Sequence, residues 1–407
     1  MKKLLACFLS LVVAVFLFSG SALAQEMSKE ELIKELKALK ERMRSLEEAL
    51  EIPEKAETSD IIEDEDVEDL EEFIKRIEFY GTIEVEAGYE QIKPKVGEKE
   101  DYSDLTLATV DFAIDALITD RMRTHILFEY EDGENVGDGN FIIDEAIIHY
   151  QAKEVCAPDL SCNSPWYANI GRLTIPFGYF ESLFINGPLT EDLGETKETA
   201  VIAGVYNPFI NIAAGVFNGD IDKAGNDDRI ESYVAACTFT LPEDVSPNVG
   251  LMLGVSYISN IADSDELADF IVDEFDLAVP GFDYVAGFSS FLSVSLMNRF
   301  FFEAEYVGAV ESFEEDKNFK PKAWNFELAF IPIEDVEVAF RYGGSADTFG
   351  TAENLLPDTQ VGICGIYEIF NNTSIGLEYL YEEFEYYEEI GNDAEVVTIT
   401  TQLAVEF

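Results

Sequence analysis

Basic side chains are scarce in this sequence. Lysine and arginine together number 26, against 82 aspartates and glutamates, and the formal net charge at pH 7 is −56. Binding to a nucleic-acid backbone or to anionic lipid headgroups requires lysine and arginine facing the phosphates. The composition therefore argues against nucleic acid as a partner and against peripheral binding to anionic lipid. A water-filled pore with this average charge would favour cations over anions.

Histidines and the motifs of enzyme sites are also scarce. The chain has 2 histidines, His125 and His149, and both lie in strand-like segments. A Ser-His hydrolase would have to use one of them, and the sequence around His125 shows no carboxylate placed to orient it. There is no glycine-rich phosphate loop and no His/Cys spacing typical of a metal site. We therefore expect no enzyme and no cofactor, with a lipase based on His125 as the weaker alternative.

Long apolar runs are absent beyond the first 24 residues. Lys2 and Lys3 precede an apolar run over 4–18, and Ala22-Leu23-Ala24 follows it, the pattern of a cleaved signal peptide. The run is too short for a comfortable transmembrane helix. We expect residues 1–24 to be a signal peptide that directs the chain out of the cytoplasm.

Cysteine is limited to 5 residues, one of which, Cys7, lies in the expected signal peptide. Cys156 and Cys162 lie in a connection rich in proline, asparagine and serine, and an exported protein can form a disulfide between them. The alternative is two free thiols in a loop. Cys237 and Cys364 lie within strand-like runs, where we expect small packing residues.

Residues 25–52 have a heptad pattern that the rest of the chain lacks. The apolar positions are separated alternately by four and three residues, with charged side chains between them. These positions are Leu32, Leu36, Leu39, Met43, Leu46 and Leu50. They predict either one amphipathic helix that packs on its own protein or a short coiled coil between subunits, such as those of a homo-trimer. Pro53 ends the helix, and 53–77 is an acidic linker.

Residues 78–407 alternate apolar and polar side chains with a period of two. In the last segment Val397, Ile399 and Leu403 share one face, and Thr398, Thr400 and Gln402 share the other. Segments of this kind, separated by turn residues, are typical of a transmembrane β-barrel, although a soluble sandwich can show the same alternation. We count about 16 strands, an even number as in bacterial outer-membrane barrels. They are expected at 78–90, 104–118, 121–132, 141–151, 166–173, 198–206, 209–218, 229–240, 248–260, 281–296, 299–311, 322–331, 335–344, 358–369, 373–386 and 395–407.

The lengths of the connections favour the barrel over the sandwich. Short connections such as 119–120 and 297–298 alternate with long ones such as 174–197 and 261–280. Outer-membrane barrels have short periplasmic turns and longer outer loops. The sequence thus predicts an all-β antiparallel barrel in the outer membrane of a Gram-negative bacterium, preceded by a periplasmic helical segment. Three acidic loop stretches could bind Ca²⁺, but none has a complete EF-hand spacing, and solvated charge is the preferred interpretation. They are 132–138, 220–228 and 263–276.

The long connection 174–197 is unusually apolar for a loop. A segment with this many apolar side chains would be unfavourable in water, whereas folding into the barrel would bury them and narrow the lumen. The alternative is a loop packed over the barrel mouth or against a neighbouring subunit. The residues expected to form the constriction are Pro176, Phe177, Gly178, Tyr179, Phe180 and Phe184.

At this loop the sequence resembles a known family. The run Gly171 to Gly178 has the form G-R-x-x-x-P-F-G, and it follows a strand that starts at Trp166. Together with the helical segment before the first strand, this run resembles the phosphate-selective porin O/P group, and more closely the LbtU-type siderophore porins. The resemblance implies passive, plug-independent passage of a ferric siderophore. The sequence departs from the anion-selective relatives because it lacks a ladder of lysines and arginines. The alternating last strand, which ends in Phe407, resembles the signal that the barrel-assembly machinery reads.

A small set of charged side chains is expected to face the lumen, because lysine or arginine on the lipid face at mid-depth costs roughly 2–4 kcal/mol. The basic members could oppose the acidic ones and orient a solute in a transverse field, or could simply neutralise charge within the wall. The set comprises Arg121, Arg123, His125, Arg172, Arg341, Glu303, Glu305, Glu327 and Glu337. The sequence therefore predicts a passive pore for a siderophore or another small solute, with a general or ion-selective porin and a structural barrel as alternatives.

Overall fold

The computed structural model describes residues 76–131, 140–152, 166–221, 229–268, 284–313, 319–346, 356–387 and 392–407. The expected signal peptide, heptad segment and acidic linker, and the Cys156–Cys162 pair, lie outside these ranges. The described part forms 16 strands, the short helix α4 (Leu189–Gly194) and the 3-10 helix η1 (Ile261–Asp263). The strands are β1 (Ile77–Pro94), β2 (Glu100–Thr119), β3 (Met122–Glu131), β4 (Asn140–Gln151), β5 (Tyr167–Thr174), β6 (Lys197–Tyr206), β7 (Ile210–Phe217), β8 (Ser232–Thr240), β9 (Val249–Ile258), β10 (Gly287–Leu296), β11 (Phe300–Ala309), β12 (Lys322–Ile333), β13 (Val336–Ala346), β14 (Thr359–Phe370), β15 (Thr373–Tyr387) and β16 (Asn392–Glu406).

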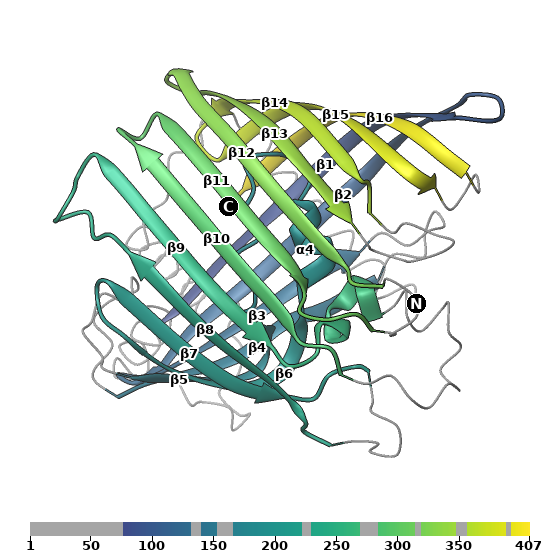
Figure 1. Ribbon diagram of the computed structural model, residues 1–407. Coiled ribbons are helices and arrows are strands. Elements are labelled where there is room, and N and C mark those ends of the chain that lie inside the picture. The colour runs from purple at the N-terminus through teal and green to yellow at the C-terminus, as the bar shows by residue number, and fades with distance from the viewer. Residues whose placement is uncertain are drawn as a thin grey trace, which may run out of the picture. The chain divides into compact units, whose positions relative to one another are not determined.

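The strands form one closed antiparallel barrel (Figure 1). Each strand pairs with its neighbours in the sequence, and β1 pairs with β16 along a register that includes Thr82 with Glu406 and Pro94 with Ala394. Closure leaves no unpaired sheet edge, which is the condition for a sheet to lie in lipid. The expected fold class is confirmed, and each expected strand overlaps the observed strand in the same place along the chain.

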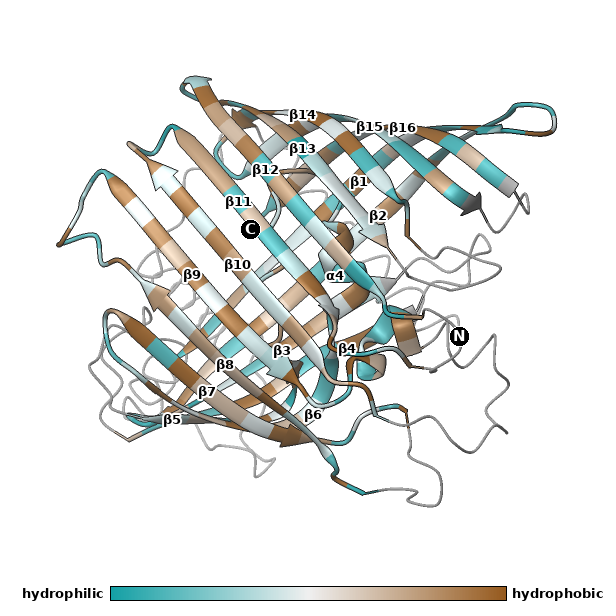
Figure 2. Cartoon of the chain, viewed as in Figure 1, coloured by the Kyte–Doolittle hydropathy of each residue, from teal (hydrophilic) through white to brown (hydrophobic). Residues whose placement is uncertain are grey.

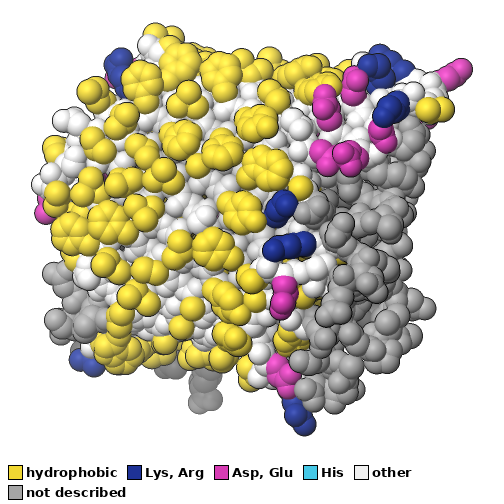
Figure 3. All heavy atoms as spheres, viewed as in Figure 1, with side chains coloured by type: hydrophobic (Ala, Val, Ile, Leu, Met, Phe, Trp, Pro, Cys, Tyr) yellow, Lys and Arg dark blue, Asp and Glu magenta, His cyan; other side chains and the backbone are white. Residues whose placement is uncertain are grey.

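The two faces of the wall differ in polarity, as the alternation predicted. On β6, Ala200 and Ile202 are buried on the inner face, while Val201 and Val205 are 47% and 49% exposed on the outer face. Hydropathy alternates along the strands in the same way (Figure 2). Apolar side chains cover the wall seen in Figure 3, and its Lys, Arg, Asp and Glu side chains gather at the margins. This outer surface suits contact with lipid, because exposure of so much apolar area to water would be unfavourable.

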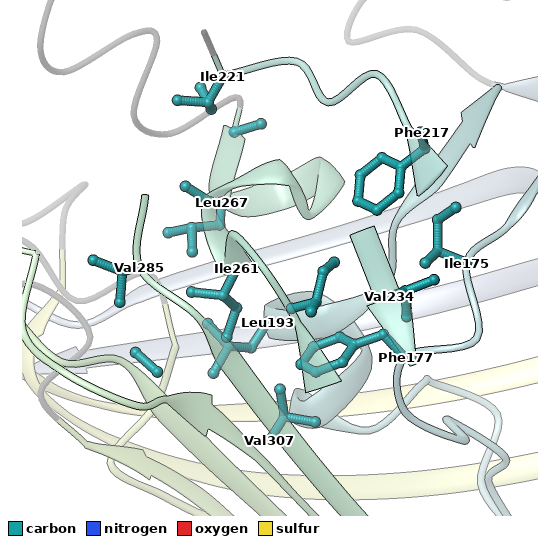
Figure 4. Close-up of a cluster of buried hydrophobic side chains, with 14 of the residues drawn as sticks. Ile175, Phe177, Leu193, Phe217, Ile221, Val234, Ile261, Leu267, Val285 and Val307 are labelled. Carbon is teal, nitrogen blue, oxygen red and sulfur yellow. The ribbon is translucent and has the colours of Figure 1, made fainter. Parts of the chain in front are cut away.

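Part of the barrel interior is filled by an apolar cluster (Figure 4). Ile175, Phe177 and Leu193, from the connection between β5 and β6, join Val234 of β8 and Val307 of β11 in this cluster. Phe177 is 1% exposed, so the connection packs firmly on the inner face. No helix in the described ranges is long and apolar enough to cross a membrane.

Candidate functional site

The segment 175–196, called here the inner loop, connects β5 to β6 and packs along the inner face of the wall. Gly178 has a φ of +91°, in the left-handed region that favours glycine, and its N–H donates to Ser256 Oγ of β9 at 3.0 Å. The Tyr179 ring stacks on Phe291 of β10, with centroids 4.5 Å apart. Pro176, Phe177 and Tyr179 were expected to form a constriction. Pro176 and Phe177 start the part of the inner loop that lies over β8–β10, and Tyr179 follows them in that part.

Glu305 of β11 holds the middle of the inner loop. Its carboxylate accepts the backbone N–H of Tyr179 at 2.7 Å and that of Phe180 at 3.1 Å, and it also accepts the Thr190 hydroxyl at 2.9 Å. Phe180 itself has a φ of +58°. A carboxylate that is 7% exposed needs such donors, because its lost hydration must be replaced.

The next anchor is the buried ion pair between Glu327 of β12 and Arg341 of β13. Arg341 Nε donates to Glu327 Oε1 at 2.8 Å, and both side chains are 0% exposed. Glu327 also accepts the Leu183 N–H at 2.6 Å. Arg341 donates to the carbonyls of Gly187 and Asn186 at 2.9 and 2.7 Å. The pair therefore binds both donors and acceptors of the inner-loop backbone.

Glu378 of β15 holds the far end of the turn at 185–186. It accepts the backbone N–H groups of Ile185 at 2.8 Å and Asn186 at 3.2 Å, and the Asn186 side-chain amide as well. Phe184 lies beside these bonds, buried against Ala339, Cys364 and Leu380, with Arg341 Cζ 4.3 Å from its ring centroid. Buried carboxylates on three strands thus fix one continuous loop to the wall.

The remaining expected acidic residues also lie on the inner face. Glu303 of β11 is half-buried and accepts the Ser293 hydroxyl at 2.9 Å. Glu337 of β13 is half-buried on the same face as Arg341. Glu305 and Glu327 point inward as expected. They are, however, buried under the inner loop and do not face the water of the lumen.

Arg123 and His125 of β3 face inward and meet Asp115 of β2, which the sequence analysis did not identify. Arg123 forms an ion pair with Asp115, and His125 Nδ1 lies 3.1 Å from Asp115 Oδ1. The Tyr80 hydroxyl lies 3.2 Å from the other Asp115 oxygen, and His125 Nε2 lies 3.6 Å from Glu145. These groups largely satisfy one another, which matches the alternative of charge neutralisation within the wall.

Two expected lumen-facing arginines lie elsewhere. Arg121 lies in the turn before β3 and is exposed, so its assignment to a strand face is wrong. Arg172 pairs with Ala146 and Thr199 and alternates with the buried Leu173, which places Arg172 on the outer face with exposed Ile170. Its Nε donates to the Asp144 carbonyl at 3.2 Å. Arg172 lies near the loop end of β5, where an outward arginine costs little compared with one at mid-depth.

The inner loop carries acidic side chains of its own. Burial and the charges of Glu195 and Asp192 raise the pKa of Glu191 to about 7. Burial, followed by the charge of Glu266, raises the pKa of Asp192 to about 7. Glu181 is exposed at the turn of the loop. The loop therefore contributes negative charge to the lumen at pH 8 and less of it at pH 5.

On the opposite side of the barrel, β1 and β2 carry carboxylates that take no part in the inner-loop hydrogen bonds described above. Glu84 and Glu86 of β1 and Asp111 of β2 are partly exposed on the inner face, although Asp111 Oδ1 is buried without a hydrogen-bond partner among the described residues. Glu86 accepts a hydrogen bond from Gln402 of β16 at 2.9 Å. In a ring of 16 strands β2 lies opposite β10, so these groups face the loop-covered wall. This side of the lumen is acidic.

Residues whose role depends on pairing across strands were not predicted from the sequence. Asp115 precedes His125 by ten positions and joins it only through the β2–β3 register. Glu378 lies in a run of glutamates and tyrosines, and its inward orientation follows from the period of two. That period could have identified Glu378 as lumen-facing, but nothing in the sequence connects it to residues 185–186.

Comparison with known proteins gives distant relatives and a clear structural likeness. No protein-family model matches the chain. A UPF0422 protein of Coxiella burnetii is 25% identical over 234 residues, which cover 54% of this chain and 48% of that protein. A UPF0422 protein of Legionella pneumophila is 22% identical over 318 residues, covering 69% and 54%. The chain spans about half the length of the curated relatives it matches.

Three solved structures share the architecture. The outer membrane channel DcaP of Acinetobacter baumannii has a TM-score of 0.55 and 14% identity, and the match covers 81% of this chain and 97% of DcaP. OprB of Pseudomonas putida gives 0.55 and 10%, covering 84% and 96%. An anion-selective porin from Comamonas acidovorans gives 0.52 and 10%, covering 81% and 99%. At these identities the likeness concerns the fold, and this chain therefore has the barrel fold of outer-membrane porins.

Proposed function

We propose that this protein is a passive, non-enzymatic porin of the outer membrane, with a water-filled lumen that the inner loop narrows and that favours cations. The observation that carries the proposal is the attachment of the inner loop to the inner wall by Glu305, Glu327 and Glu378. A loop held inside a barrel reduces the cross-section that a solute can use. The apolar outer surface and the porin-like fold support a position in the outer membrane.

The charge of the lumen supports the preference for cations. Glu84, Glu86 and Asp111 line the wall opposite the anchored part of the inner loop, and Glu181 is exposed on the loop itself. A narrow passage between low-dielectric walls focuses the field of such charges and raises the local concentration of cations.

The remaining segments complete the proposal. Residues 1–24 would be removed as a signal peptide, 25–52 would form a periplasmic helix or coiled coil, and 53–77 would link it to the barrel. A homo-trimer and recognition of the last strand by the barrel-assembly machinery are part of the same proposal. They rest on the sequence patterns alone.

The test is the reversal potential of single channels of the purified full chain under a KCl gradient in a planar bilayer. We expect discrete conductance steps and a potential that shows preference for K⁺ over Cl⁻. Preference for Cl⁻ would contradict the assignment of the lumen charge, and absence of conductance would contradict the channel. Hydrolysis of phospholipid that disappears in His125→Ala would contradict the non-enzymatic function.

A ferric siderophore is a second candidate for the permeating solute, because of the resemblance of residues 171–178 to LbtU-type porins. The acidic lumen disfavours polyanionic siderophores and leaves neutral or cationic ones as better candidates. Uptake of a ferric hydroxamate by liposomes with the protein, compared with protein-free liposomes, tests this candidate. Equal uptake in the two preparations would eliminate it.

A further inference from the structure

A small hollow lies on the inner face of β5–β8, next to the start of the inner loop. Pro176 of the loop lines one side, and Tyr167 and Asn169 of β5 line another. Asn211 and Ala213 of β7 and Ala236 of β8 also line it. The hollow has a volume of about 120 Å³ and is partly open to solvent.

The hollow exists because the inner wall is made of small residues at this place. Ala213 and Ala236 face each other in the β7–β8 register, and neither side chain extends into the lumen. At Gly204 of β6 an added Cβ would come within 2.5 Å of the Tyr167 ring. Glycine therefore allows the ring to lie against the wall, where it forms one side of the hollow.

Hydrogen bonds fix the orientation of the polar groups. The Tyr167 hydroxyl donates to Asn211 Oδ1 at 3.1 Å, and His149 Nδ1 lies 2.6 Å from Asn169 Oδ1. Both amide oxygens are therefore engaged, and the amide N–H groups remain as donors. Thr238 adds a hydroxyl to the lining.

Two buried acceptors lie directly beside these groups. Gln151 is 1% exposed, it pairs with Tyr167 in the β4–β5 register, and its Oε1 has no hydrogen-bond partner among the described residues. His149 Nε2 is also buried without a partner in the described part of the chain. A buried polar atom without a partner costs free energy, but neither residue lines the hollow, so these two atoms belong to the wall beside it and are not contacts for a ligand.

The lining contains no carboxylate, lysine or arginine, in contrast to the acidic wall of β1 and β2. A charged solute would lose water here without gaining an opposite charge. An uncharged solute with several hydroxyl groups can accept hydrogen bonds from the asparagine amides and pack its C–H surface on the Tyr167 ring. We propose that this hollow is a binding subsite for a small uncharged polyhydroxylated solute.

The subsite goes beyond the proposed channel, and its test does not depend on conduction. Saturation-transfer NMR of D-glucose with the detergent-solubilised full chain measures binding at equilibrium. Signal transfer to glucose is expected with the unaltered protein. Asn211→Leu should weaken binding by about fivefold, the loss expected for one neutral hydrogen bond. Ala236→Phe should abolish binding by filling the hollow. Thr398→Val, an inner-face change on β16, is the matched control and should leave binding unchanged.

Each variant is first checked for the folded barrel by its migration on unheated SDS gels. If Asn211→Leu fails this check, Ala236→Phe alone decides the question. Absence of transfer to glucose, or equal transfer in the unaltered protein and Ala236→Phe, would overturn the proposal. Stronger transfer to gluconate or glucosamine than to glucose would overturn it as well, because the site would then select charge. A channel that fails to conduct would leave this binding result unaffected.

Discussion

Two parts of the inner wall use the same residue type in opposite ways. On β11, β12 and β15, the carboxylates of Glu305, Glu327 and Glu378 are buried and saturated by hydrogen bonds from the inner loop. On β1, the carboxylates of Glu84 and Glu86 remain partly exposed to the lumen. The first group holds a segment in place, whereas the second sets the electrostatic potential of the passage.

The difference shows that the number of acidic residues in a lumen does not by itself measure its selectivity. A carboxylate that accepts two or three N–H donors has its charge compensated locally, and a buried one is not accessible to a permeating ion. A half-exposed carboxylate keeps its field in the water of the pore. Substitution of the buried carboxylates and of the exposed carboxylates in separate variants tests this difference in role.

The largest effect is expected from Arg341→Met, which leaves Glu327 buried without its counter-charge. Removal of one partner of a buried ion pair costs about 3–5 kcal/mol. The inner loop also loses the bonds to the carbonyls of Asn186 and Gly187. We expect a lower temperature for loss of the folded form on unheated SDS gels, and a larger and noisier single-channel conductance.

The double variant Glu327→Leu with Arg341→Met is the control for this prediction. It removes both charges of the pair and leaves neither partner unpaired, so most of the stability should return, since an apolar replacement of a buried pair is often neutral. The conductance should stay enlarged, because the inner loop still lacks the anchor at Glu327 and Arg341. Equal stability of Arg341→Met and the unaltered protein would show that the pair does not hold the wall and the loop together.

An intermediate effect is expected from neutralising the carboxylates of β1 that are exposed to the lumen. Glu84→Gln combined with Glu86→Gln should lower the preference for K⁺ over Cl⁻ by about twofold or more, because these charges act on the ions in the passage. Glu305→Gln should change the preference less and increase the current noise, because this carboxylate is compensated by the inner loop. Reversal potentials of both variants measure the contrast. A larger shift in Glu305→Gln than in the double variant would reverse the assigned roles.

The smallest effect concerns the pH dependence of stability. The pKa of Glu191 is raised from its ordinary value of 4.5 to about 7 by burial and by nearby acidic groups. The folded state therefore holds this proton more tightly than the unfolded state, and stability falls as pH rises from about 4.5 to about 7. With screening of this part-exposed group, the loss between pH 5 and pH 8 should be on the order of 1 kcal/mol.

Glu191→Gln removes this titration and provides the matched comparison. The variant should be more stable than the unaltered protein at pH 8 and should differ little from it at pH 5. Urea unfolding curves of the barrel in lipid vesicles at the two pH values measure the difference. A variant that loses stability at pH 8 would show that the Glu191 charge is favourable in the inner loop.

Much of the fold could be predicted from the sequence. The period of two identified the strands, and on β16 it assigned Leu403 to the outer face and Gln402 to the inner face. Arg121 was misplaced because the turn at 120–121 interrupts that period. Arg172 was misplaced because its charge outweighed its position in the alternation, although Leu173 beside it is buried. Near the end of a strand, position decides the side-chain direction, since an outward charge costs little there.

The sequence by itself determined that the chain alternates in polarity, that it forms about 16 antiparallel strands, and that the segment after β5 is too apolar to remain in water. These properties are local, because each depends on residues a few positions apart. Only the tertiary structure decided which carboxylates anchor the inner loop and which line the passage. Glu378 lies 192 residues from Asn186 along the chain, and barrel closure brings them together. No pattern in the sequence records such a pairing, because it depends on where the loop crosses the wall.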